Sequence, residues 1–251
     1  MPLLVAHQYR CARAGACRAT ALFGRTIRAV EDRFVILNAF DPRDLEWTLS
    51  VLHLARMAGI KRVVQLRGFS HERSDVLDVA RECRALDVTL ELLDEKLALD
   101  AGFDGKTGEE IASGVRAWRA GARVTWGGRS VALLGYPGEL TYADVERLPD
   151  SFVGGADIAI GGELSVSWNS NENAPIGSPS VRDALNQLRP LLHVCPSIAG
   201  RVDLTEVVEG TGIAVCGIPC ASYESVVVLD MVKAKVLGTP RPMGAFYRGI
   251  S

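Results

Sequence analysis

Side chains that could bind a metal ion are sparse in this sequence, and most of them are carboxylates. The only four histidines are scattered along the chain, at positions 7, 53, 71 and 193. Acidic residues follow several segments that we expect to be strands, namely Asp41, Asp94, Glu95 and Glu163. Carboxylate oxygens are the ligands that Mg²⁺ and Ca²⁺ prefer, so these residues could gather one hard cation. The alternative is that they are solvated loop acids, because most Asp and Glu side chains in proteins are exposed.

Other patterns that carry chemistry do not occur in the sequence. A serine nucleophile would require a Gly-x-Ser-x-Gly elbow, and the glycine pairs at 154–155 and 161–162 lie in no nucleotide-binding frame. A soft-metal site could be built from His193, Cys195, Cys216 and Cys220. Alternate side chains of a strand point to opposite faces, however, so these residues favour ordinary core packing. We therefore expect no cofactor and no metal.

Composition predicts a globular protein without a strong electrostatic field. The chain has 251 residues, 48% hydrophobic residues and a formal net charge of -2. A nearly neutral chain has no global attraction for nucleic acid or anionic lipid, so we expect neither as a partner. No apolar run approaches the roughly 20 residues of a membrane helix, and no cleavable leader is apparent. We expect a soluble, cytoplasmic protein.

Two regions differ in composition. Residues 1–33 are rich in arginine, and residues 34–251 alternate apolar and polar segments as one α/β domain would. The arginine-rich segment could be a basic arm that docks on an acidic partner, or it could resemble a transit peptide. It could equally be an irregular entry segment with solvated arginines.

Apolar periodicity predicts strands and helices in alternation. Short buried strands are expected at 34–37, 62–66 and 88–93, with amphipathic helices between them. The tetrapeptide Thr107-Gly108-Glu109-Glu110 matches a capping box, which predicts the start of a further helix. Gly127-Gly128 between two β-prone runs predicts a hairpin, and Ser178-Pro179 predicts a helix through Leu188. The β-rich end predicts two packed sheets with helices outside them.

Several of these segments together resemble calcineurin-like metallophosphoesterases. The resemblance covers roughly residues 34–231 and depends on five framework segments: Asp44-Leu45-Glu46-Trp47, Val63-Val64-Gln65-Leu66, Val124-Thr125-Trp126-Gly127-Gly128-Arg129, Arg189-Pro190-Leu191-Leu192-His193-Val194 and Val226-Val227-Val228-Leu229-Asp230. It implies a four-layer α/β/β/α sandwich of metallo-dependent phosphatase type. It also implies a two-metal centre at the strand ends, which would activate water and polarise a phosphoryl oxygen.

The metal-ligand motifs of that family are missing from this chain. The Asp-x-His motif falls on Phe40 and Pro42 in one register and on Asp41 and Arg43 in another, and both registers lose the histidine. The metal-bridging Asp of the Gly-Asp motif falls on Gly68. The remaining ligand positions fall on Glu95, Lys96, Gly162, Glu163, Ser197 and Ala199. Loss of every family imidazole removes the nitrogen ligands that such a metal pair requires.

We therefore expect a catalytically inactive relative, with no catalytic residue, that acts as a binding or structural subunit in an assembly. Its partner would be another protein or a second copy of the chain. Aromatic and arginine residues anchor most protein interfaces, so the former active-site face would offer Phe40, Arg43, Arg67, Phe69 and Trp168. Phe40 and Phe69 could instead fill the space that two cations leave. The alternative function is a metal-dependent phosphoesterase with a rebuilt, atypical metal site.

Overall fold

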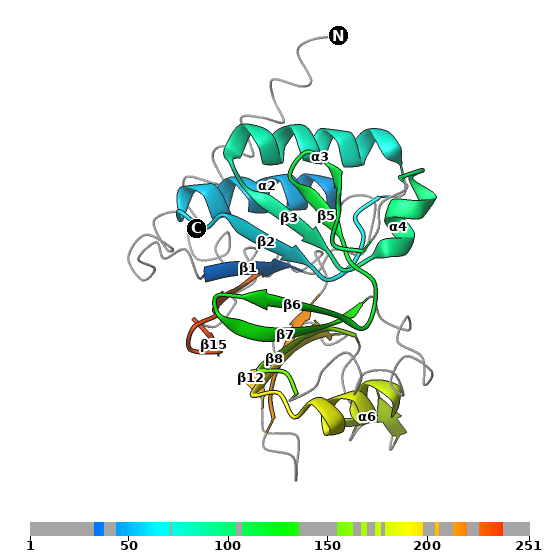
Figure 1. The fold of residues 1–251 in the computed structure, drawn as a ribbon, viewed down its shortest axis with the longest axis vertical. Helices are drawn as coiled ribbons and strands as arrows, with labels where there is room; N and C mark the ends of the chain where they lie inside the picture. The colour runs from blue at the N-terminus through cyan, green and yellow to red at the C-terminus, as the bar shows by residue number, and fades with distance from the viewer. Residues whose placement is uncertain are drawn as a thin grey trace, which may run out of the picture.

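Two mixed β-sheets and a small number of helices form the described part of the molecule (Figure 1). The structure is a computed structural model. It describes residues 33–37, 44–70, 72–103, 107–135, 155–162, 167–169, 174–176, 179–197, 204–205, 213–219 and 226–237. The α/β class expected from the sequence is confirmed.

The first sheet has seven strands in the order β15-β14-β1-β2-β3-β5-β4. Its centre is parallel, because β1, β2, β3 and β5 all run in one direction, and β14 and β4 are antiparallel to their neighbours. The strands of this sheet are β1 Arg33–Leu37, β2 Arg62–Gln65, β3 Thr89–Leu92, β4 Glu110–Ala112, β5 Val115–Ala117, β14 Val226–Asp230 and β15 Lys235–Val236. Helices α2 (Asp44–Met57) and α3 (Arg73–Leu86) make the crossovers between the parallel strands, and α4 (Glu95–Asp100) follows β3.

The second sheet has six strands in the order β12-β13-β11-β8-β7-β6. Strands β7, β8, β11 and β13 are parallel to one another, and β6 and β12 are antiparallel at the two edges. Its strands are β6 Ala122–Trp126, β7 Arg129–Gly135, β8 Ile158–Gly161, β11 Leu192–Ser197, β12 Leu204–Thr205 and β13 Ala214–Pro219. Helix α6 (Pro179–Leu188) precedes β11, and β9 (Ser167–Asn169) pairs with β10 (Ala174–Ile176) as a separate ribbon.

Three clusters of buried side chains hold these elements together. One lies between α2, α3 and the first sheet, and includes Val51, Val79 and Leu90. The inter-sheet core joins the facing sides of the two sheets, and includes Ile36, Leu133 and Val194. The third joins α6 to the second sheet. Figure 1 accordingly shows α2 and α3 above the first sheet and α6 below the second.

Local sequence explains several boundaries of these elements. Helix α3 buries Val76, Val79, Ala80 and Cys83, a spacing that places them on one face. It ends at Asp87, which takes the left-handed conformation at φ 53°. The expected hairpin is confirmed: Gly127 (φ 56°) and Gly128 (φ 74°) connect β6 to β7. The helix expected to end at Leu188 is confirmed as α6.

The prediction that a helix starts at Thr107–Glu110 is wrong. Glu110 begins strand β4 instead, and the two capping side chains bond to groups that lie further along the chain. Thr107 Oγ1 accepts from the backbone N–H of Arg119 at 3.0 Å, and a Glu110 carboxylate oxygen accepts from the N–H of Gly114 at 2.8 Å. Gly108 lies at φ 80°, outside the helical region. Hydrogen bonds around the β4–β5 hairpin have replaced the local capping box.

We expect the stability of the fold to depend on the inter-sheet core. Leu133 is fully buried there, so Leu133→Ala should lower the free energy of unfolding by about 2–5 kcal/mol through lost burial and a cavity. Leu191 is 58% exposed, and Leu191→Ala should change stability by less than about 0.5 kcal/mol. Urea denaturation of both variants measures the difference, and equal losses would contradict this account of the core.

Candidate functional site

The carboxyl ends of the parallel strands in both sheets meet at one edge of the molecule. Gly161 ends β8, and a β-carbon placed on it would lie 3.0 Å from the Leu93 side chain, which follows β3, and 2.6 Å from the Gly135 carbonyl oxygen at the end of β7. The N–H of Gly162 donates to that same carbonyl at 2.8 Å. Open α/β sheets bind ligands outside the carboxyl ends of their strands. This carboxyl edge is therefore the candidate site.

Asp94 is the acidic residue placed most clearly at the carboxyl edge. It follows β3, is only 7% exposed, and accepts a hydrogen bond from the backbone N–H of Gly68 at 3.2 Å. Gly68 follows β2, so this bond ties the ends of two neighbouring strands. A carboxylate that accepts from a buried N–H stabilises the loop. Asp94 thus has a structural role at the position where the sequence suggested a cation ligand.

Gln65 and Thr48 form a buried polar pair that sequence reasoning missed. Both side chains are fully buried, and Thr48 Oγ1 on α2 lies 3.2 Å from Gln65 Oε1 at the end of β2. The Nε2 of Gln65 has no hydrogen-bond partner among the described residues. A glutamine at the end of the otherwise apolar run Val63-Val64-Gln65-Leu66 was the available signal, because a buried amide requires partners.

His193 lies fully buried at the centre of the second sheet. Its Nε2 is 3.0 Å from the carbonyl oxygen of Gly161, so Nε2 carries the proton and donates. Burial lowers the pKa of His193 to about 4, which the hydrogen bond to Gly161 only partly offsets. The imidazole is therefore neutral at physiological pH, and its hydrogen bond holds the Gly161 turn at the carboxyl edge.

The cysteines considered with His193 have the properties of core residues. Cys195 and Cys216 are fully buried, and burial raises the pKa of both thiols, that of Cys216 to about 12. A protonated thiol is a poor metal ligand. Cys216 belongs to the inter-sheet core, and Cys220 lies outside the described residues. Within the described ranges, no group of three or more His, Cys, Asp and Glu side chains is placed to hold a metal ion.

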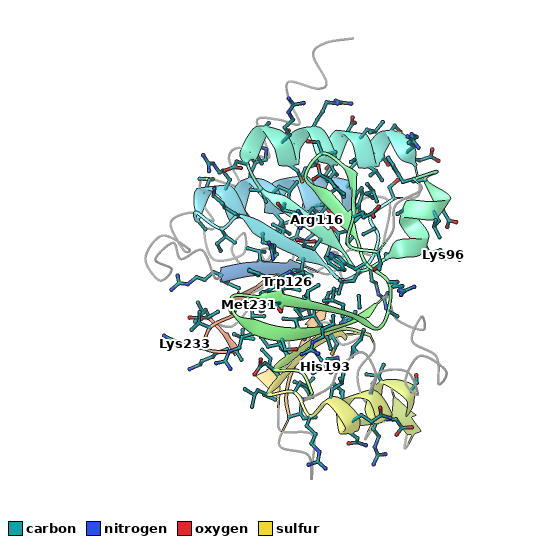
Figure 2. The ribbon with its side chains drawn as sticks, viewed as in Figure 1. Lys96, Arg116, Trp126, His193, Met231 and Lys233 are labelled. Carbon is teal, nitrogen blue, oxygen red and sulfur yellow. The ribbon has the colours of Figure 1, made fainter. Side chains whose placement is uncertain are left out.

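The structure describes some of the other residues singled out from the sequence. Gly68 and Gly162 lie at the ends of β2 and β8, and Ser197 ends β11. Glu95 and Lys96 open α4, where the Lys96 side chain is exposed (Figure 2). Trp168 is in β9. The predictions for Phe40, Asp41, Pro42, Arg43, Glu163 and Ala199 lie outside the described residues.

The two described interface candidates next to Gly68 differ in burial. Arg67 is half-buried, whereas Phe69 is only 1% exposed and packs in the core between α2, α3 and the first sheet. A side chain that is already buried in its own domain cannot anchor a partner. Phe69 is therefore a core residue and is removed from the proposed contact surface.

We expect the burial of neutral His193 to make stability depend on pH. The unfolded imidazole binds a proton near its ordinary pKa of 6.5, and the folded one resists protonation down to about pH 4. The contribution of His193 is therefore present above pH 6.5 and is lost as pH falls toward 4.

Urea denaturation between about pH 4 and pH 7 tests this expectation. His193→Gln cannot titrate but retains an amide donor for Gly161, so its stability should fall less steeply with decreasing pH than that of the unsubstituted protein. Identical slopes in the two proteins would show that His193 is not the buried neutral base described above.

Comparison with known proteins reveals a shared fold at low sequence identity. No protein-family model matches the chain, and no curated protein matches it. The crystal structure of TT1561 of Thermus thermophilus matches with a TM-score of 0.54 and 14% identity, covering 84% of this chain and 99% of that one. Another solved structure matches with a TM-score of 0.56 and 13% identity, covering 82% of this chain and 98% of that one. At these identities the likeness shows the fold alone.

Proposed function

We propose that this protein is a catalytically inactive, metallophosphoesterase-like binding protein that serves as a subunit of an assembly. The layered arrangement supports this proposal, because helices flank two sheets whose facing sides share one core. That order is the one expected of the four-layer α/β/β/α sandwich that the sequence resemblance implies. The proposal therefore combines a phosphoesterase-like scaffold with an altered strand-end chemistry.

One observation carries the proposal. Gly68 stands where the family places the aspartate that bridges two metal ions, and the nearby carboxylate of Asp94 is hydrogen-bonded to the Gly68 backbone N–H. Two cations held close together repel each other strongly unless a shared anion compensates. At this position the chain supplies the backbone N–H of Gly68, and the neighbouring Asp94 carboxylate accepts a hydrogen bond from it.

The proposed contact surface is the carboxyl edge, and Arg67 is its member whose side chain is described. A half-buried arginine beside a glycine turn can present a planar guanidinium to carboxylates or aromatic rings of a partner. Phe40, Arg43 and Trp168 remain the predicted companions of Arg67. The partner would be a different protein or a second copy of this chain.

Metal binding and hydrolysis separate this proposal from a phosphoesterase with a rebuilt metal site. Isothermal titration of the chelator-treated protein with Mn²⁺ and Mg²⁺ should detect no stoichiometric site. Hydrolysis of bis(p-nitrophenyl) phosphate with Mn²⁺ should stay at the rate without protein. Metal-dependent hydrolysis that Asp94→Asn abolishes would overturn the proposal, because this substitution keeps an oxygen acceptor for Gly68 and removes only the charge.

Substitutions at the adjacent residues Arg67 and Phe69 test the contact surface. Arg67→Ala should weaken recovery of the partner, or self-association, by at least about 1 kcal/mol while the chain still folds. Phe69→Ala should lower the free energy of unfolding by about 3–5 kcal/mol because it empties a core position. Sedimentation velocity and quantitative pull-down measure association, and thermal melts measure stability. Unchanged association of Arg67→Ala would remove Arg67 from the interface.

A further inference from the structure

A buried carboxylate lies between two arginines on the side of the first sheet that faces the second. Glu91 on β3 is fully buried. Its Oε1 lies 3.3 Å from Nε of Arg62, and its Oε2 accepts from the indole Nε1 of Trp118 at 2.7 Å. Arg116 on β5 pairs with Glu91 in the parallel register, so both side chains lie on the same face of the sheet. Figure 2 labels Arg116 and Trp126 in this region.

Aromatic rings hold the Arg62 guanidinium in place. Its Cζ lies 5.0 Å from the ring centroid of Phe34 and 5.3 Å from that of Trp126, and the rings of Trp118 and Trp126 meet edge to face at 6.3 Å. A stacked guanidinium loses little further freedom when it binds a ligand. Burial lowers the pKa of Arg62, Arg116 lowers it further, and Glu91 opposes both effects. Arg62 is thus a partly desolvated cation in a fixed orientation.

Several guanidinium donors of this cluster have no acceptor within the described residues. Glu91 supplies one negative charge for two guanidiniums. Arg116 is half-buried and makes no hydrogen bond or ion pair with any described residue. Glu110 lies opposite Arg116 on β4, but its carboxylate accepts from the N–H of Gly114 at 2.8 Å and forms no ion pair with Arg116 in the described part of the chain. The terminal guanidinium nitrogens of Arg62 and Arg116 therefore have no hydrogen-bond acceptor among the described residues.

We propose that Arg62 and Arg116 form an oxyanion-binding site, walled by Trp118 and Trp126, that accepts a carboxylate or a phosphate. A guanidinium pairs with such a group through two parallel N–H···O bonds, and these bonds strengthen where water is partly excluded. Arg62 pairs with Glu91 through Nε at 3.3 Å, and its terminal nitrogens are the donors that would bind the anion.

This site is separate from the carboxyl edge. Arg62 is the first residue of β2 and Gly68 follows the end of that strand, so the two sites lie toward opposite ends of β2. The inference goes beyond the proposed function, because anion binding at Arg62 and Arg116 requires nothing of Asp94 or Gly68. A free anion and an acidic side chain of a partner present the same chemistry to the site.

Calorimetric titration of the full chain distinguishes these sources. One arm uses sodium phosphate and the other a short Asp-containing peptide, each at an ionic strength held constant with NaCl. We expect saturable binding in at least one arm. Arg116→Gln should reduce the affinity at least about tenfold, because it removes a charge-assisted, bidentate contact. Arg116 has no described partner, so this substitution should not unfold the protein.

Arg123→Gln is the matched control. Arg123 is exposed on β6 of the second sheet, and its Nε donates to Ser130 at 3.2 Å, so the substitution removes the same charge from a place outside the cluster. Binding by Arg123→Gln should equal that of the unsubstituted protein. Three results would overturn the proposal: no binding in either arm, undiminished binding by Arg116→Gln, or equal losses in the two variants.

Discussion

Burial of the facing sides of the two sheets against each other is the interaction on which the rest of this structure depends. Strand β1 and its neighbours contribute Ile36, Val64 and Leu229, and the second sheet contributes Leu133 and Val194. Each fully buried aliphatic side chain stabilises the fold by roughly 1.5–3 kcal/mol relative to exposure. This core consists of apolar side chains of the chain itself.

Sheet packing also determines where the candidate site lies and how tightly it is built. Gly161 approaches Gly135 and Leu93 so closely that any side chain there would clash, and His193 holds the carbonyl of Gly161 from within the sheet. Asp94 ties the end of β3 to the end of β2 in the same region. Among the described residues, backbone contacts and hydrogen bonds thus tie several strand ends of the carboxyl edge to one another.

Local sequence signals predicted several turns and helices. Contacts between residues far apart in the sequence determined the features that were not predicted. The hairpin at Gly127-Gly128 and the helix that starts near Pro179 were predictable, because glycine and proline limit the backbone at those positions. The capping box at Thr107 failed because its side chains bond to Arg119 and Gly114. Likewise, no local pattern indicates that Glu91 meets Arg62 and Trp118, since strand pairing brings these residues together. The core position of Phe69 became clear only from its burial in the structure.

The central claim is that the Asp94 carboxylate accepts a hydrogen bond from the Gly68 backbone N–H and does not bind a metal ion at the carboxyl edge. Paramagnetic Mn²⁺ broadens NMR signals of nuclei close to its binding site. Two-dimensional ¹H–¹⁵N spectra recorded during a titration to one equivalent of Mn²⁺ therefore test the claim directly. The account predicts that the amide signals of Gly68, Asp94 and Gly162 stay as sharp as those of the distant hairpin residue Gly128. Selective loss of those three signals at one equivalent of Mn²⁺ would contradict it.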